Sequence, residues 1–304
     1  MASSAEHRHI HAGAHGLLFA LAGYCLLSMG DAVVKSMAGL WAPTAIAALR
    51  YLFGAIGLGA ILAIKEGRAA FSVVNPLAHW GRALSVSFAS VCFFISVKLM
   101  PLGDATAITF VMPMITAMLS ALFLGEKATR ATWIASIVAF AGVLIVLRPN
   151  VADAGWAALF PLGSALGMSA LILFNRKVAG QASVLAMQFY VAAFAAPILI
   201  ASAVLGEMTG IKAMQVGMPD WTVVARCALV AVSASVAHTL IFLATTRASA
   251  ATIAPMTYVQ LLVAMTVGAF AFGDLPDVTS LGGSALIVGA GLYLWRSAQP
   301  RKAK

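Results

Sequence analysis

Residues 101–127 read PLGDATAITFVMPMITAMLSALFLGEK, an apolar run with a proline near its middle and a glycine, an acidic and a basic residue at its end. No charged side chain occurs between residues 105 and 124. About 20 apolar residues are enough for one helix to cross the hydrocarbon core of a bilayer, which is roughly 30 Å thick. The stretch therefore predicts a membrane-spanning helix that is broken or kinked at Pro113.

The composition of the whole chain agrees with this interpretation. Of the 304 residues, 62% are hydrophobic and only 10% are charged, whereas soluble domains have about 45–50% and about 25%. The charges form short groups that are separated by apolar runs about twice as long as a barrel strand requires. We therefore expect an all-α integral membrane protein in contact with the lipid bilayer, and no binding to nucleic acid.

The apolar runs predict ten transmembrane helices, separated by charged residues or by segments rich in proline and glycine. The predicted spans are 15–37, 43–64, 80–99, 103–124, 131–148, 155–174, 184–205, 221–245, 249–272 and 279–296.

The distribution of lysine and arginine predicts the orientation. Thirteen of these residues fall on the side of the N-terminus and four on the opposite side, while Lys35 and Arg50 lie within spans. Cytoplasmic loops of membrane proteins carry the excess of positive charge. Both termini are therefore predicted to be cytoplasmic, with residues 1–14 and 298–304 as cytoplasmic tails.

The two halves of the chain contain similar segments. LGEK at 124–127 corresponds to FGDL at 272–275, and AGVLIVLR at 141–148 to AGLYLWR at 290–296. Each half also has a proline within its fourth span, Pro113 and Pro255. The predicted halves, 15–149 and 150–297, have five spans each, an odd number, so they must be inverted relative to each other in the membrane.

Inverted repeats with interrupted helices are typical of secondary transporters that bind their substrate near the bilayer midplane, between the halves. Pro113 and Pro255 are then the predicted helix breaks or hinges. Duplication in a membrane protein that does not transport is the alternative explanation.

The segments 101–127 and 142–149 resemble the repeat motif of the drug/metabolite transporter superfamily, EamA type, and 253–274 and 281–293 resemble its second copy. The similarity covers nearly the whole chain. It implies a ten-helix carrier of small metabolites in the bacterial inner membrane with a central cavity. Members that export amino acids, particularly aromatic ones, are closest in character. Asp274 stands where the second copy usually has glutamate.

Three charged residues lie inside the first two spans. Asp31 and Lys35 are one helical turn apart, in the order that favours pairing, and Arg50 is at a similar depth in the next span. A charge in the membrane costs about 2.5–3.5 kcal/mol on insertion scales, so it needs a partner or a function. These residues either hold the two spans together and close the outer gate, or bind a substrate carboxylate through Arg50 or Lys35.

Polar and aromatic residues deep in spans are the other candidates for substrate binding. Such a set suits an amino-acid-like zwitterion with an apolar side chain, although each residue could instead bond a neighbouring helix. The predicted substrate-binding residues are Tyr24, Asp31, Arg50, Tyr51, Thr106, Thr109, Met112, Gln188, Tyr190, His238, Tyr258 and Gln260. His238 could couple transport to protons or bond another helix as a neutral ring.

Acidic residues at the ends of two spans have a structural explanation. Glu126 and Asp274 are expected to cap the N-terminus of the following helix, where the helix dipole favours a negative charge, rather than to bind substrate.

The remaining features predict no cofactor, no metal site and no catalytic residues. The N-terminal HRHIHAGAH at 7–15 is expected to be disordered, and Cys25, Cys92 and Cys227 lie in apolar runs without paired spacing. We find no P-loop for ATP and no protease or hydrolase motif.

The predicted function is therefore export of amino acids by alternating access, driven by protons or by the substrate gradient. The protein is expected to be a monomer. The alternatives are import or export of another metabolite or drug and, in other classes, an intramembrane enzyme or a channel.

Overall fold

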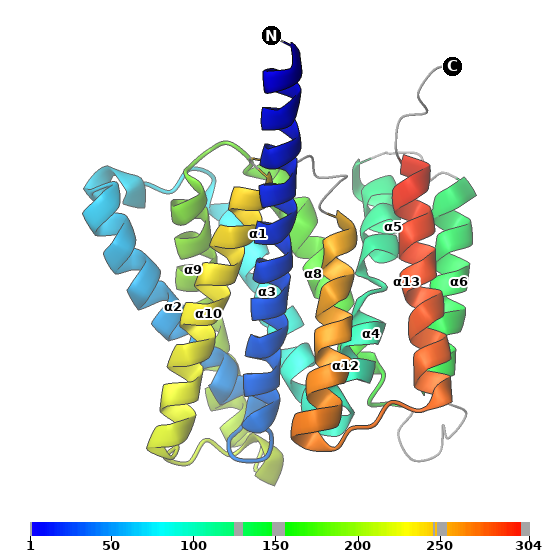
Figure 1. The fold of residues 1–304 in the computed structure, drawn as a ribbon. Helices are drawn as coiled ribbons and strands as arrows, with labels where there is room; N and C mark the ends of the chain where they lie inside the picture. The colour runs from blue at the N-terminus through cyan, green and yellow to red at the C-terminus, as the bar shows by residue number, and fades with distance from the viewer. Residues whose placement is uncertain (1, 125–129, 148–155, 246, 248–253, 299–304) are drawn as a thin grey trace.

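The computed structural model consists of helices that run roughly parallel to one another in a single bundle (Figure 1). It describes residues 2–124, 130–147, 156–245, 247 and 254–298. Within these residues the only β-type pairing is an isolated bridge between Ala38 and Trp41, in the turn after the first helix. The predicted all-α class is therefore confirmed for the described part of the chain.

The described residues of the first half form six α-helices and one short 3₁₀ helix. They are α1 (Ala2–Ser36), α2 (Pro43–Lys65), η1 (Arg68–Phe71), α3 (Pro76–Leu99), α4 (Leu102–Thr109), α5 (Met112–Leu124) and α6 (Arg130–Leu147).

The described residues of the second half form five α-helices and two short 3₁₀ helices. They are α8 (Leu159–Lys177), α9 (Val184–Met208), η2 (Lys212–Met214), α10 (Trp221–Thr245), η3 (Ala254–Tyr258), α12 (Val259–Phe272) and α13 (Val278–Ala298).

The helices in the described residues are long and apolar enough to account for a multi-pass membrane protein. Eight of them meet the length and hydropathy expected of a span, with α4 and α5 counted together over Leu102–Phe123. Two further apolar helices, Trp133–Val146 and Met256–Phe272, are shorter. These ten helical segments correspond to the ten predicted spans, and two of them are shorter than the sequence suggests.

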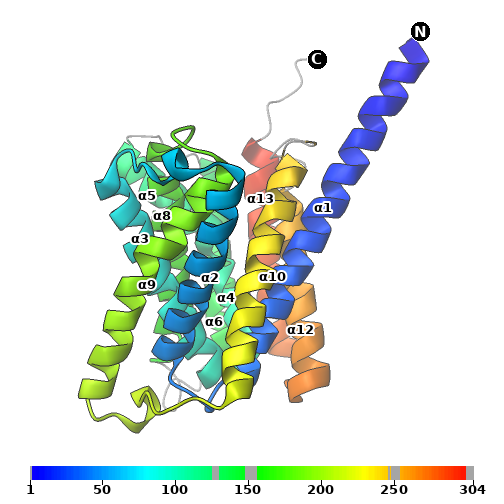
Figure 2. The same ribbon diagram turned by 90° about the vertical axis from the view of Figure 1, so that its left-hand side faces the viewer.

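The helix α1 begins well before the predicted span. It runs without interruption from Ala2, so the histidine-rich stretch expected to be disordered is helical. Its first turns project beyond the rest of the bundle, as both views show (Figures 1 and 2). The helix α13 ends at the same end of the bundle at which α1 begins.

The most extensive contacts between helices join the two halves of the chain. The helix α1 packs on α10, α2 on α9, α3 on α8 and α6 on α13. The largest group of buried apolar side chains comes from α1, α2, α3, α9 and α10, and is formed around residues such as Met37, Ile46 and Leu199. Small residues permit the close packing of α6 on α13, because a Cβ atom added to Gly283 would come within 2.6 Å of the Gly142 carbonyl oxygen.

The two predicted helix breaks lie beside irregular backbone. Thr109 ends α4 and Met112 begins α5, so the interruption at residues 110–111 falls just before Pro113. Proline fits the first turn of a helix because the amide hydrogen that it lacks would have no partner there. In the second half, Pro255 lies in the 3₁₀ helix η3, directly before α12.

Arg82 is buried in the bundle, although the sequence assigned it to the cytoplasmic side among the loop cations. Its side chain is only 5% exposed, and it joins α3 to α8 and α9. Nε donates to Asn175 Oδ1 at 2.6 Å, and Nη2 donates to the Met187 carbonyl at 3.2 Å. Nη1 lies 2.9 Å from Nδ1 of His79. These contacts explain how a charge is accommodated there.

Two acidic residues cap helices at the end of the bundle opposite the start of α1. Asp277 Oδ1 accepts the backbone N–H of Ser280 at 2.8 Å and so caps α13. Asp220 accepts the N–H of Thr222 at 2.8 Å before α10, and this hydrogen bond lowers the pKa of Asp220 below its ordinary value. The predicted cap at Glu126 lies outside the described residues.

Candidate substrate-binding site

Arg50 is held at the centre of the candidate site by aromatic side chains. The first residues of α2, from Pro43 to Ala48, are buried against neighbouring helices, which fixes the position of the next turn. The guanidinium of Arg50 lies over the ring of Tyr51, 4.5 Å from its centroid, and 5.5 Å from the ring centroid of Phe94 on α3. Aromatic faces attract and orient a cation without neutralising it.

Arg50 has no acidic partner in direct contact. In the part of the chain that the structure describes, no carboxylate lies within ion-pair distance of its guanidinium, and Lys35–Asp274 is the one ion pair. Its Nε atom is buried and has no hydrogen-bond partner among the described residues. A buried donor without a partner is costly, so this geometry suits an anionic group that binds from outside the protein.

Side chains of α1 and α10 lie within electrostatic range of Arg50. Its charge acts on Asp31 of α1 and on Cys227 and His238 of α10. Asp31 is partly exposed and His238 is exposed, although both lie in membrane-spanning helices. Asp31 and Arg50 form no ion pair within the described part of the chain.

Ser90 and Phe94 of α3 contribute to the site, although the sequence did not identify them as candidates. The Tyr51 hydroxyl lies 3.0 Å from Oγ of Ser90, one helical turn before Phe94 on α3. Ser90 and Phe94 are common residue types in membrane helices, and only their four-residue spacing could have indicated that they share a face.

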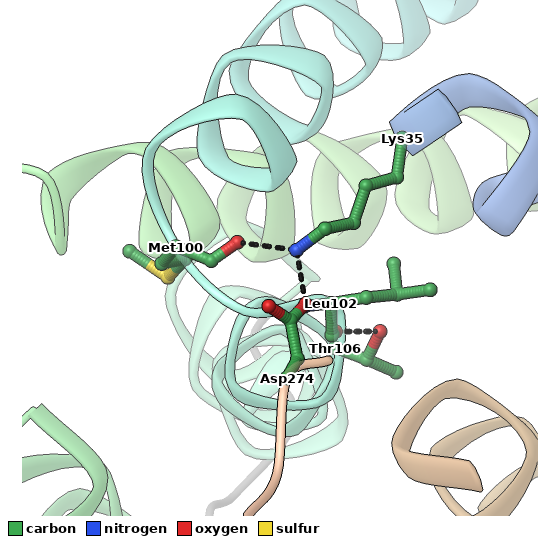
Figure 3. A network of polar contacts seen from close by, with 5 residues as sticks. All are labelled: Lys35, Met100, Leu102, Thr106 and Asp274. Carbon is green, nitrogen blue, oxygen red and sulfur yellow. Dashed lines mark hydrogen bonds and ion pairs between the residues drawn. The ribbon is translucent and has the colours of Figure 1, made fainter. Parts of the chain in front are cut away.

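Lys35 is paired with Asp274, whereas the sequence suggested Asp31 as its partner. Figure 3 shows the Lys35 ammonium between the Asp274 carboxylate and the Met100 carbonyl, to which it donates at 3.2 Å. Asp274 Oδ2 also accepts the backbone N–H of Leu102 at 3.3 Å. Asp274 thus caps a helix as predicted, but the helix is α4 of the first half and not the following α13.

The predicted threonines of α4 are bonded within their own helix. Thr106 Oγ1 donates to the Leu102 carbonyl at 2.8 Å, and Thr109 Oγ1 to that of Ala105 at 2.9 Å. Met112 has a half-buried side chain, and its carbonyl accepts from Ser169 Oγ at 3.0 Å. These contacts favour a structural role for both threonine hydroxyls.

Tyr190 connects α9 to the segment around η1. It is buried, and its hydroxyl lies 2.6 Å from the Ala70 carbonyl and 3.1 Å from that of Ser72. These contacts favour a structural role for the Tyr190 hydroxyl, which links α9 to the segment around η1. Gln188, two residues earlier, is half-buried.

Three predicted residues lie around α12 and the inner part of α1. Tyr258 packs on Phe110 with ring centroids 5.4 Å apart, and the carbonyl of Gln260 accepts from Ser28 Oγ at 2.9 Å. Tyr24 packs beside Ala20 and Ala244. The structure therefore places Tyr51 against Arg50, puts Asp31 and His238 within electrostatic range of it, and gives the other candidates separate surroundings.

An apolar cavity of about 350 Å³ lies between α2 and α9. Its lining consists of apolar side chains with one acidic residue, Glu207, and it includes none of the predicted binding residues. A polar substrate finds no matching groups there, so we centre the candidate site on Arg50.

Comparison with a solved structure supports the architecture. One crystal structure matches 94% of this chain and 99% of its own with a TM-score of 0.63 and 18% sequence identity. The two proteins therefore share a fold.

Known transporters match the chain over most of its length. An S-adenosylmethionine uptake transporter of Rickettsia bellii is 26% identical, covering 85% of this chain and 86% of its own. A riboflavin transporter of Rhizobium johnstonii is 27% identical over 79% and 77% of the two chains, and a pseudopaline exporter of Pseudomonas aeruginosa is 23% identical over 93% and 96%. These relatives do not single out aromatic amino acids as the substrate.

The family comparison covers the first half of the sequence. Residues 14–148 match the EamA-like transporter family. The first half of the chain is therefore similar to the EamA-like transporter family, and most of its length is similar to known membrane transporters.

Proposed function

We propose that the protein is a secondary transporter that exports a small amino-acid-like metabolite across the bacterial inner membrane by alternating access. The observation that carries this proposal is the Arg50 guanidinium, whose Nε is buried and has no hydrogen-bond partner among the described residues. We assign Asp31 of α1, which lies within electrostatic range of Arg50, as the group that binds a positive charge. A zwitterion brings a carboxylate for Arg50 and an ammonium group for Asp31.

The chemistry of one relative's substrate agrees with this proposal. S-adenosylmethionine, which the Rickettsia bellii relative takes up, contains an α-amino carboxylate. Arginine suits such a group because its planar fork can donate two parallel hydrogen bonds to a carboxylate. Tyr51 and Phe94 hold that fork in one orientation, which reduces the entropy lost on binding.

The test is uptake of labelled compounds into proteoliposomes that contain the purified protein. We expect saturable uptake of an amino acid or amino-acid derivative, with competition from zwitterions but little from the corresponding amine that lacks the carboxylate. The Arg50→Met variant should lose about tenfold or more of the uptake, because a charge-assisted bidentate contact contributes about 1.5–3 kcal/mol.

A matched variant controls for the loss of one positive charge. Lys65, in the last turn of α2, is exposed and lies fifteen residues after Arg50 in the same helix, so Lys65→Met should retain uptake. Absence of uptake for every compound of a panel of amino acids, nucleosides, polyamines and sugar phosphates would overturn the proposed substrate class. Flux that never saturates would instead indicate a channel.

The direction of transport needs intact cells. Cells that express the protein and are preloaded with labelled substrate should release the label faster than cells expressing Arg50→Met. Faster accumulation from the medium, with unchanged release, would replace export by uptake.

A further inference from the structure

The ion pair Lys35–Asp274 joins three segments that are distant in the sequence. Lys35 lies in the last turn of α1, and Asp274 follows the C-terminal end of α12, 239 residues later. Their side chains are only 12% and 21% exposed. The third segment is the junction of α3 and α4, where the Met100 carbonyl accepts from Lys35 and the Leu102 N–H donates to Asp274 (Figure 3).

The helix α4 depends on this ion pair for its N-terminal cap. Its own N-cap residue, Pro101, makes no capping hydrogen bond, and the first amide groups of a helix have no partners within the helix. Asp274 provides an acceptor and a negative charge at that end, where the helix dipole favours it. The second half of the chain therefore stabilises the start of α4.

The helices α4 and α12 pack closely enough to act as one unit. A Cβ atom added to Gly103 of α4 would come within 2.8 Å of Cγ of Met265 on α12. Both helices border irregular backbone, since α4 is separated from α5 at residues 110–111 and α12 follows the 3₁₀ helix η3. Short 3₁₀ segments and proline breaks often mark hinges.

The contact of α1 with α12 is held at two polar points. Ser28 Oγ donates to the Gln260 carbonyl of α12, and Lys35, seven residues later on the same face of α1, binds Asp274. Ser28 is only 1% exposed. If α12 moved away from α1, both contacts would be lost and Ser28 would become accessible.

We propose that Lys35 and Asp274 form a latch that holds the α4–α12 unit against α1 and closes the transport pathway at the end of the bundle where α1 terminates. This end opens when the two side chains separate. The proposal rests on the proposed alternating-access function, and the predicted orientation places this end outside the cytoplasm.

The test measures exposure of a cysteine reporter and needs no substrate, so it is independent of the substrate proposed above. Ser28→Cys is introduced, and its reaction with a polar thiol reagent is followed in the purified protein in detergent. The parent protein contains only Cys25, Cys92 and Cys227, and its reaction with the same reagent gives the background rate. The reporter should react slowly while the latch is closed, and about tenfold faster or more when Lys35→Met or Asp274→Asn is added.

Asp274→Asn is the milder variant, because the amide oxygen can still accept the Leu102 N–H, and it keeps the test valid if Lys35→Met folds poorly. Arg226→Met is the matched control. Arg226 also contacts the end of α1, donating to the Ser36 carbonyl at 3.1 Å, but it comes from α10 and should leave the reporter protected. The latch would be overturned if the reporter reacted as slowly in the Lys35→Met and Asp274→Asn variants as it does without them. It would also be overturned if Arg226→Met accelerated the reaction as much as Lys35→Met does.

A second measurement tests whether the latch must open. In the double variant Lys35→Cys/Asp274→Cys, the two thiols lie too far apart for a direct disulfide, because the lysine stem spans most of the gap. Joining them with a short bis-thiol reagent that has a reducible spacer should abolish uptake of whichever compound the wild-type protein transports, and reduction of the spacer should restore it. Full uptake by cross-linked protein would contradict the proposal, whereas absence of transport by the wild type would count against the proposed function alone.

Discussion

At Gly291 the absence of a side chain makes room for the hydroxyl of Tyr258. A Cβ atom on Gly291 would overlap that hydroxyl group, and Tyr258 is also held by Phe110 from the other half of the chain. The position of one predicted site residue therefore depends on a glycine in a different helix.

This arrangement makes Gly291→Ala a test of the packing around Tyr258. We expect the substitution to displace the ring and to cost about 1–3 kcal/mol of stability, as insertion of atoms into a packed interior does. The control is Gly289→Ala two residues earlier, where a Cβ atom would have no neighbour within 4 Å. Thermal unfolding in detergent should show a lower midpoint for Gly291→Ala only, and equal midpoints would refute the argument.

Sequence reasoning identified Asp31, Lys35 and Arg50 as charges within helices but could not assign their partners. The four-residue spacing of Asp31 and Lys35 favoured a pair within one helix, because such contacts are visible in the sequence. The actual partner of Lys35 is 239 residues away and is recognisable only once α12 lies beside α1. For Arg50 the sequence left a structural role and a substrate-binding role open, and the structure adds the aromatic rings of Tyr51 and Phe94 that hold its guanidinium.

At the scale of helices, the boundaries of several spans were predictable from composition. The structure begins α2 at Pro43, and α10 covers Trp221–Thr245, as the apolar runs indicated. The start of α1 was not predictable in this way, since its first residues are polar and periodicity gives no signal for them. The short length of α12 reflects local backbone geometry around Pro255 and not a change in hydropathy.

Two of the prolines inside predicted spans, Pro113 and Pro197, have different surroundings, which permits a direct comparison. Pro113 is the second residue of α5, beside a break, whereas Pro197 lies within α9, which continues through it. In Pro113→Ala, the new amide hydrogen could bond the Thr109 carbonyl and favour one continuous helix. We expect lower transport with normal protein levels.

Pro197→Ala is the matched control and should transport normally, because it removes a proline without joining two helices. Protein levels in the membrane and initial uptake rates are the measurements. If Pro113→Ala transports as well as Pro197→Ala, the break before α5 has no role in transport.

At the scale of the whole molecule, the helix contacts support the proposed inverted repeat. In order of spans, α1, α2 and α3 correspond to α8, α9 and α10. In the same order, α6 corresponds to α13. If every helix is replaced by its counterpart in the other half, the α1–α10 contact becomes the α8–α3 contact, and the α2–α9 and α6–α13 contacts stay the same. All four are the most extensive contacts of the bundle, as a two-fold relation between the halves requires.

The predicted orientation can be tested with reporter fusions. Since α1 begins and α13 ends at the same end of the bundle, reporters at both termini should give the same result, and a reporter in the 206–219 loop the opposite one. The excess of lysine and arginine on the side of the termini predicts that side to be cytoplasmic. Alkaline phosphatase that is active at the C-terminus and inactive in the loop would reverse the orientation.

The cross-half pairing of helices also has a consequence for biosynthesis. Each helix that leaves the ribosome can satisfy its own backbone hydrogen bonds in the lipid, but α1, α2, α3 and α6 must wait for partners from the second half. Insertion and assembly are therefore separate stages, and a nascent chain arrested at the midpoint would lack its main tertiary contacts. Because α13 follows the other described helices in the chain and is the partner of α6, we expect loss of α13 to leave an inserted but unassembled protein, which is a substrate for membrane quality-control proteases.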